Sequence, residues 1–141
     1  MGLFSRLFGS DESSSTITMQ TADITNGPGT YTVDVVGESH YQEALESICG
    51  GRNEDSQRLE VEAFLVPEND NPYDSNAVRI FIQDQTVGYL DRETARSFRK
   101  MMAEIGLTEV AAKCNAIIVG GWDRGGEDRG HFGVKLDLPT A

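Results

Sequence analysis

The sequence has little that would cross-link a chain or hold it in a membrane. Its 141 residues include two cysteines, four prolines and one tryptophan, and no apolar run approaches the roughly 18 residues that a membrane-spanning helix needs. Cys49 and Cys114 lie far apart without a C-x-x-C motif, so reduced thiols are expected in place of a disulfide or a zinc site. We therefore expect a soluble, cytoplasmic protein with no stable membrane span, no metal ion and no cofactor.

Positive charge is also scarce. The chain has 12 Lys and Arg against 23 Asp and Glu, which gives a net charge of -11. Proteins that contact duplex DNA along many phosphates are usually basic, so broad DNA binding is not expected. A pocket for one chain end needs few phosphate contacts and remains compatible with this charge.

The first thirty residues differ from the rest in composition. Residues 1–9 form a short amphipathic patch, with Leu3, Phe4, Leu7 and Phe8 on one helical face. Either a contact with a membrane or partner, or a frayed terminus, is compatible with this patch. Residues 10–30 are rich in Ser, Thr, Asp, Gly and Pro. We predict a flexible tail over residues 1–30 and one folded domain over residues 31–139.

Alternating and helical patterns predict the elements of that domain. The strands are expected over residues 31–36, 58–66, 77–82, 86–90, 111–119 and 133–138, and the helices over residues 41–48 and 92–105. In the last strand, alternation directs Lys135 and Asp137 outward. Short strands with two small helices cannot build a large parallel sheet. The predicted fold is mostly β with two short helices, a small OB-like barrel.

The turn between the second and third strands is the first candidate site. Asn71-Pro72-Tyr73-Asp74 is a proline-fixed turn that would expose an aromatic plane beside a carboxylate. A structural alternative has Asp74 capping backbone amides and Tyr73 folding over the core. The acidic residues around this turn lack the register of a calcium loop. A ligand site that combines stacking with a hydrogen-bond acceptor is therefore one of two interpretations.

Two further segments combine positive charge with possible nucleic-acid contacts. A basic stripe follows the second helix and consists of Arg92, Arg96, Arg99 and Lys100. The glycine-rich loop over residues 120–130 adds Trp122 and Arg124, and aromatic planes beside guanidinium groups suit single strands. The alternatives are a solvated helix face and a tryptophan lid on the core. No nucleophile and base pair stands out by spacing, so an enzyme is not expected.

Several of these segments together resemble the HIRAN domain, a module of DNA-repair translocases. The resemblance covers roughly residues 31–139 and depends on four motifs: Val35-Val36-Gly37, Asn71-Pro72-Tyr73-Asp74-Ser75-Asn76-Ala77-Val78, Val87-Gly88-Tyr89-Leu90 and Gly130-His131-Phe132-Gly133-Val134. It implies an OB-like barrel that captures the 3′-hydroxyl end of single-stranded DNA. In such domains the turn tyrosine stacks on the terminal base and the aspartate accepts from the 3′-hydroxyl.

Carried onto this sequence, the resemblance gives Tyr73 and Asp74 these two roles. Asn71 would shape the turn, Arg92 would contact phosphate, and Tyr89 is the variable residue of its strand. The chain departs from the family where an arginine and an aromatic residue follow Val-Val-Gly, because Ser39 and His40 stand there. The predicted DNA-binding residues are Asn71, Tyr73, Asp74, His40, Tyr89, Arg92, Arg96, Trp122 and Arg124.

The expected function is that of a stand-alone DNA-end binding module in DNA repair or replication. No motor domain accompanies it in this sequence, so a helicase or nuclease partner protein is expected to supply catalysis. The alternative is a protein-interaction or regulatory module that kept the barrel and lost DNA binding, which the negative net charge and Ser39 favour.

Overall fold

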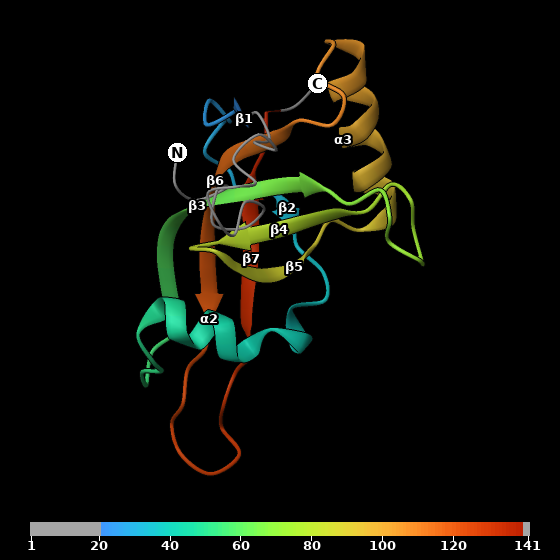
Figure 1. The fold of residues 1–141 in the computed structure, drawn as a ribbon. Helices are drawn as coiled ribbons and strands as arrows, with labels where there is room; N and C mark the ends of the chain where they lie inside the picture. The colour runs from blue at the N-terminus through green and yellow to red at the C-terminus, as the bar shows by residue number, and fades with distance from the viewer. Residues whose placement is uncertain (1–20, 140–141) are drawn as a thin grey trace, which may run out of the picture.

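A computed structural model of the chain describes residues 21–139. Within these residues the protein has a seven-stranded sheet, one 3₁₀ turn and two α-helices (Figure 1). The strands are β1 (Thr21–Asp23), β2 (Val33–Asp34), β3 (Gln57–Pro67), β4 (Val78–Ile82), β5 (Gln85–Tyr89), β6 (Ala111–Gly120) and β7 (Phe132–Asp137). The helical elements are η2 (Glu38–His40), α2 (Gln42–Cys49) and α3 (Arg92–Glu104). The prediction of a mostly β, OB-like fold with two short helices is confirmed.

The strands curl into a barrel in the order β2-β7-β6-β3-β4-β5, each pair antiparallel. A single bridge joins the two ends of this order. The N–H of Val36 donates to the carbonyl of Tyr89 over 2.8 Å, and the N–H of Tyr89 donates back over 2.9 Å. Gly88 makes the bridge possible, because a Cβ there would lie 2.4 Å from Val35 Cγ1. We call this bridge the seam.

The core fills the barrel from the inward faces of the strands. In β4, Val78, Ile80 and Ile82 are fully buried, as alternation predicts. The two helices lie at different ends of the barrel, and the β6–β7 loop extends past α2 (Figure 1). The helix predicted over residues 92–105 ends one residue earlier, because α3 ends at Glu104 and Ile105, the residue after it, is 62% exposed.

The folded part begins earlier than the predicted boundary at residue 31. Strand β1 lies inside the predicted tail and pairs in parallel with the start of β6, with Thr21 opposite Ala111 and Asp23 opposite Lys113. Ala22 and Asp23 have little β-propensity of their own, so the pairing of this short strand depends on the edge that β6 offers. The amphipathic patch of residues 1–9 lies outside the described residues.

Asp137 was predicted to point outward, but its side chain is not exposed to solvent. Its carboxylate is buried, with 2% of the residue exposed. The segment before β2 covers it: Gly29 donates its N–H over 2.8 Å, Thr30 over 3.1 Å and Tyr31 over 3.3 Å. We call this arrangement the Asp137 clasp. Strand alternation could not reveal it, because the covering segment comes from a distant part of the sequence.

The two cysteines are both free thiols. Cys114 is buried in the core and Cys49 is partly buried. Burial, together with the charge of Asp137, raises the pKa of Cys114 to about 12, so this thiol is unreactive at neutral pH. In the part of the chain that the structure describes, no helix has the length and apolar character to cross a membrane.

Candidate functional site

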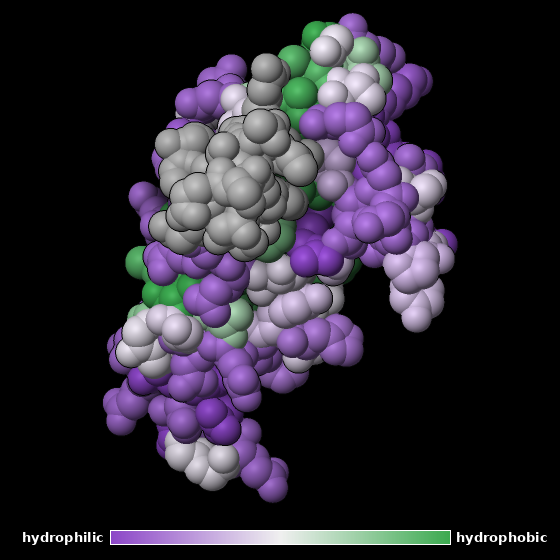
Figure 2. Space-filling view, in the orientation of Figure 1, coloured by the Kyte–Doolittle hydropathy of each residue, from purple (hydrophilic) through white to green (hydrophobic). Residues whose placement is uncertain are grey.

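The loop between β3 and β4 presents Tyr73 at its apex. Asn71 shapes the loop, because its side-chain Oδ1 accepts the backbone N–H of Tyr73 over 2.8 Å and of Asp74 over 3.1 Å. The Tyr73 ring points away from the barrel and is 82% exposed. The alternative of a ring folded over the core is therefore wrong. In Figure 2 the same loop projects from a mainly hydrophilic surface.

The Asp74 carboxylate uses only part of its capacity to accept hydrogen bonds. Its Oδ1 accepts the backbone N–H of Asn76 over 2.9 Å, which is the capping role that a turn aspartate often has. Its Oδ2 has no hydrogen-bond partner among residues 21–139. One carboxylate oxygen therefore remains available beside the Tyr73 ring.

Most of the predicted binding residues meet in one open depression of about 680 Å³. The loop contributes three of them, and three other elements contribute one each. The residues that line the depression are Asn71, Tyr73 and Asp74 from the loop, His40 from η2, Tyr89 from β5 and Arg92 from α3. We call this depression the Tyr73 pocket.

The seam explains why residues so far apart in the sequence converge here. The bridge between Val36 and Tyr89 places η2, and with it His40, beside the end of β5. Immediately after β5, Asp91 caps α3 by accepting the N–H of Thr94 over 2.7 Å. This cap starts the helix at Arg92, whose Nη2 donates to the carbonyl of Tyr73 over 3.1 Å.

Sequence reasoning missed two residues on the pocket wall, Glu68 and Arg79. Glu68 Oε1 accepts from Asn71 Nδ2 over 2.9 Å and from the hydroxyl of Tyr89 over 3.0 Å. Glu68 Oε2 forms an ion pair with Arg79. The guanidinium of Arg79 also lies 5.8 Å from the centre of the Tyr89 ring. Arg79 faces outward from an otherwise buried strand beside the turn, a signal that could have drawn attention to it.

These contacts set the protonation states on that wall. Burial raises the pKa of Glu68, but hydrogen bonds from Asn71 and Tyr89 and the charge of Arg79 together hold it below its usual value. Burial and the hydrogen bond to Glu68 raise the pKa of Tyr89. At neutral pH, Glu68 is therefore a carboxylate and Tyr89 a neutral phenol that donates to it.

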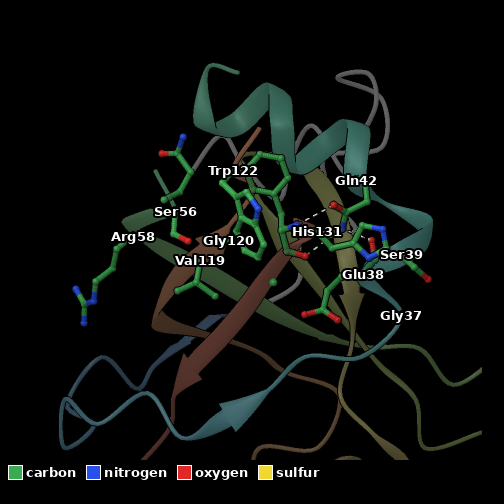
Figure 3. A pocket seen from close by; sticks show the side chains of 13 residues that line it. Gly37, Glu38, Ser39, Gln42, Ser56, Arg58, Val119, Gly120, Trp122 and His131 are labelled. Carbon is green, nitrogen blue, oxygen red and sulfur yellow. Dashed lines mark hydrogen bonds between the residues drawn. The ribbon is translucent and has the colours of Figure 1, made fainter. Parts of the chain in front are cut away.

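The other three predicted residues lie outside the Tyr73 pocket. Arg96 lines a separate groove along α3. Trp122 lines a cavity of about 800 Å³ near the β6–β7 loop, and Figure 3 shows it there with Arg58 directed away. Its indole N–H donates to Asp128 over 3.0 Å, and Arg124 lies 3.8 Å from the same carboxylate. Three of the nine predicted DNA-binding residues, Arg96, Trp122 and Arg124, thus lie apart from the other six, and their part in DNA binding stays a prediction.

The basic residues on α3 differ in whether their side chains already have partners within the protein. Arg99 Nη1 donates to the side chain of Asn69 over 2.7 Å, and its Nη2 donates to the carbonyl of Ala77 over 3.0 Å. Arg99 thus holds both ends of the Tyr73 loop and serves the structure. Arg92 and Arg96 are exposed, and neither forms an ion pair within the described residues.

Nothing in the Tyr73 pocket resembles a metal centre. Over residues 21–139, no three His, Cys, Asp or Glu side chains lie close enough together to hold a metal ion. The pocket instead combines an exposed aromatic plane, a carboxylate oxygen to which no described residue donates a hydrogen bond, and an exposed guanidinium. It can stack a flat ring, accept one hydrogen bond from a ligand and attract one anionic group.

Comparison with known proteins identifies one family. A family model described as the HIRAN domain matches residues 28–118, which is more than half of the chain. The matched segment contains the Tyr73 loop, the seam and α3, and it ends inside β6. No curated protein and no solved structure gives a significant match.

Proposed function

Because the chain belongs to the HIRAN domain family, a family of binding modules, we propose that it captures the 3′-hydroxyl end of single-stranded DNA. The observation that carries this proposal is an exposed Tyr73 ring beside an Asp74 oxygen that has no hydrogen-bond partner among residues 21–139, both on one turn. A ligand that fits must offer a flat ring and a hydroxyl donor close together. The terminal nucleotide of a DNA strand offers both.

The two residues would contribute in different ways. Stacking of the terminal base on Tyr73 would supply about 1–3 kcal/mol and would tolerate any base. Asp74 Oδ2 would accept the hydrogen of the 3′-hydroxyl, whereas a phosphate at the same place has no hydrogen to offer at neutral pH and is repelled by the carboxylate. Tyr73 would thus provide affinity and Asp74 would provide the choice of end.

Arg92 would contact the backbone of the bound strand. Its guanidinium lies beside Tyr73 and has one hydrogen bond to the carbonyl of that residue, so further N–H groups face solvent. A phosphate that precedes the terminal nucleotide would come within their reach. His40, exposed in the same pocket, would cover the other side of the base. With few phosphate contacts, binding would depend weakly on salt despite the net charge of -11.

In its biological setting, such a module would deliver a partner protein to a DNA end. We propose a role in DNA repair or replication, in the cytoplasm, with a helicase or nuclease on another chain as the partner. The proposal assigns no catalytic residue to this chain.

Fluorescence anisotropy with 5′-labelled oligonucleotides of one sequence, ending in a 3′-hydroxyl or a 3′-phosphate, tests the proposal. The wild-type protein is expected to bind the hydroxyl end at least about tenfold more tightly. Asp74→Asn should remove this preference. Asp70→Asn is the matched control, because Asp70 carries the same charge in the same pocket, and it should keep the preference. Equal binding of both ends by the wild type would overturn the proposal.

Tyr73→Ala tests the stacking contribution separately. The affinity for every 3′-hydroxyl oligonucleotide should fall by roughly 5- to 150-fold, which corresponds to about 1–3 kcal/mol per stacked base. Because the ring is 82% exposed, the melting temperature should not change. Unchanged affinity in a folded Tyr73→Ala protein would show that the ring is not the contact.

A protein-interaction role is the second candidate, and one observation favours it. Glu68, Asp70 and Asp74 all line the Tyr73 pocket, and three carboxylates in one pocket suit a basic ligand. Under this candidate, the pocket takes a basic or aromatic peptide segment. Failure of the wild type to bind any oligonucleotide in the anisotropy experiment would select it.

A further inference from the structure

Arg79 is a cation within the Tyr73 pocket whose charge is already matched. Its side chain is 36% exposed and lines the pocket, and its guanidinium forms an ion pair with Glu68. Its Nε is buried and has no hydrogen-bond partner in the described part of the chain. Arg92, by contrast, has no ion pair with any described residue. Among the described residues, the pocket therefore contains one guanidinium with an ion-pair partner and one without.

Glu68 is linked to both the charge and the shape of the pocket. One of its oxygens receives Asn71 Nδ2 over 2.9 Å, which orients the Asn71 amide. The oxygen of that amide accepts the N–H groups of Tyr73 and Asp74. A continuous chain of contacts thus runs from Arg79 through Glu68 and Asn71 to the two residues at the apex.

We propose that Glu68 is a specificity-determining residue, which pairs with Arg79 so that this guanidinium is not free to bind a phosphorylated strand end. The inference rests on the proposed capture of 3′ ends and adds to it the residue that excludes the wrong end. A guanidinium is the side chain best suited to bind phosphate with two parallel hydrogen bonds. An unpaired Arg79 would therefore work against the repulsion that Asp74 provides.

The surroundings of Glu68 favour this role over a purely structural one. Asn71 and Tyr89 need only a hydrogen-bond acceptor, which a neutral amide oxygen also supplies. The negative charge is needed only by Arg79. The pKa of Glu68 is held below its usual value, so the charge persists at neutral pH. A neutral replacement of the same size can thus separate the two functions.

Glu68→Gln is that replacement, measured by the same anisotropy experiment. Its amide oxygen can still accept from Asn71 and Tyr89, while Arg79 loses its counter-charge. Affinity for the 3′-phosphate oligonucleotide should rise by about tenfold or more, and affinity for the 3′-hydroxyl oligonucleotide should change little. The salt dependence of 3′-phosphate binding should steepen by about 0.7 in log–log slope, the value for one added phosphate contact on a single strand.

Two further variants attribute the effect. The double variant Glu68→Gln/Arg79→Gln should lose the gain, because the freed cation is gone. Arg79→Gln alone should keep the preference for the 3′-hydroxyl end. A large loss of 3′-hydroxyl binding in Arg79→Gln would mean that Arg79 itself contacts DNA, and this would overturn the proposal even if Glu68→Gln did not fold.

Inorganic phosphate provides a readout that is independent of DNA. In ¹⁵N-labelled protein, the Nε–H signal of Arg79 should shift saturably with phosphate in Glu68→Gln and stay unchanged in the wild type. No shift in a folded Glu68→Gln protein would contradict the inference. If the wild type fails to distinguish the two DNA ends while the phosphate result holds, the proposed function fails and the pairing of Arg79 by Glu68 stands.

Discussion

Two aspartates, Asp74 in the Tyr73 loop and Asp137 in the clasp, both accept backbone N–H groups, and they do so to opposite effect. Asp137 is 2% exposed and receives N–H groups from three consecutive residues of a segment far away in the sequence. Asp74 accepts a single side-chain hydrogen bond, from the N–H of Asn76, and its second oxygen has no partner in the described residues. Both oxygens of the Asp137 carboxylate accept hydrogen bonds, whereas only one oxygen of the Asp74 carboxylate does so within the described residues.

The difference indicates which of the two aspartates stabilises the fold and which can bind a ligand. A buried carboxylate is tolerated only when it is fully hydrogen-bonded, and then its removal leaves several buried donors unsatisfied. A partly exposed carboxylate with an open oxygen contributes little to folding, because water can replace its partners. We therefore expect substitutions at Asp137 to affect folding and substitutions at Asp74 to affect binding.

The largest expected effect is at the clasp. Asp137→Asn keeps the volume but turns one acceptor oxygen into an NH₂ donor that faces at least the N–H of Gly29, which lies within hydrogen-bond distance of both carboxylate oxygens. The free energy of unfolding should fall by about 2–4 kcal/mol. Denaturation in urea, followed by circular dichroism, measures it. The control is Asp34→Asn, which loses an exposed ion pair with Lys135 and should cost less than about 1 kcal/mol. Equal losses of unfolding free energy in Asp137→Asn and Asp34→Asn would contradict the special role given to Asp137.

A smaller effect is expected from crowding the clasp without changing its charge. In Gly27→Ala the new Cβ would lie 2.5 Å from the carbonyl oxygen of Asp137 and 2.7 Å from its Oδ2. The covering segment must move, at a cost of about 1–3 kcal/mol. Gly29→Ala is the control: its Cβ meets open space, but the positive φ still costs about 1 kcal/mol. A control that lost more stability than Gly27→Ala would show that contact with Asp137 is not what matters.

The smallest effect on stability is expected at the binding turn. Asp74→Ala removes one cap on the N–H of Asn76, which should cost roughly 0.5–1 kcal/mol. The same urea experiment measures it, alongside the loss of end preference in anisotropy. A loss as large as that in Asp137→Asn would mean that Asp74 holds the loop together, and that its binding effects are indirect.

The sequence was sufficient for most of the barrel because burial imposes a simple alternation. Residues 77–82 and 111–119 were predicted as strands and form β4 and β6, with ends within one residue. The clasp and β1 could not be predicted in this way. Both depend on pairing between distant segments, and residues 21–31 show no pattern that identifies their partners.

The site was predictable only in part, for a similar reason. The turn chemistry of Asn71 and Pro72 indicated an exposed apex without any tertiary information. The convergence of His40, Tyr89 and Arg92 followed from the family resemblance, and the seam is its structural cause. The pairing of Glu68 with Arg79 was missed because each residue read alone is an ordinary surface charge.

The seam has one more consequence. Two hydrogen bonds join the ends of the strand order there, whereas neighbouring strands share whole ladders. The Tyr73 pocket spans the seam: His40 follows the segment that contains Val36, and Tyr89 lies on the opposite strand. A ligand that contacts both residues would stabilise the two hydrogen bonds of the seam. Ligand binding should therefore slow amide hydrogen exchange at Val36 and Tyr89 more than at other residues.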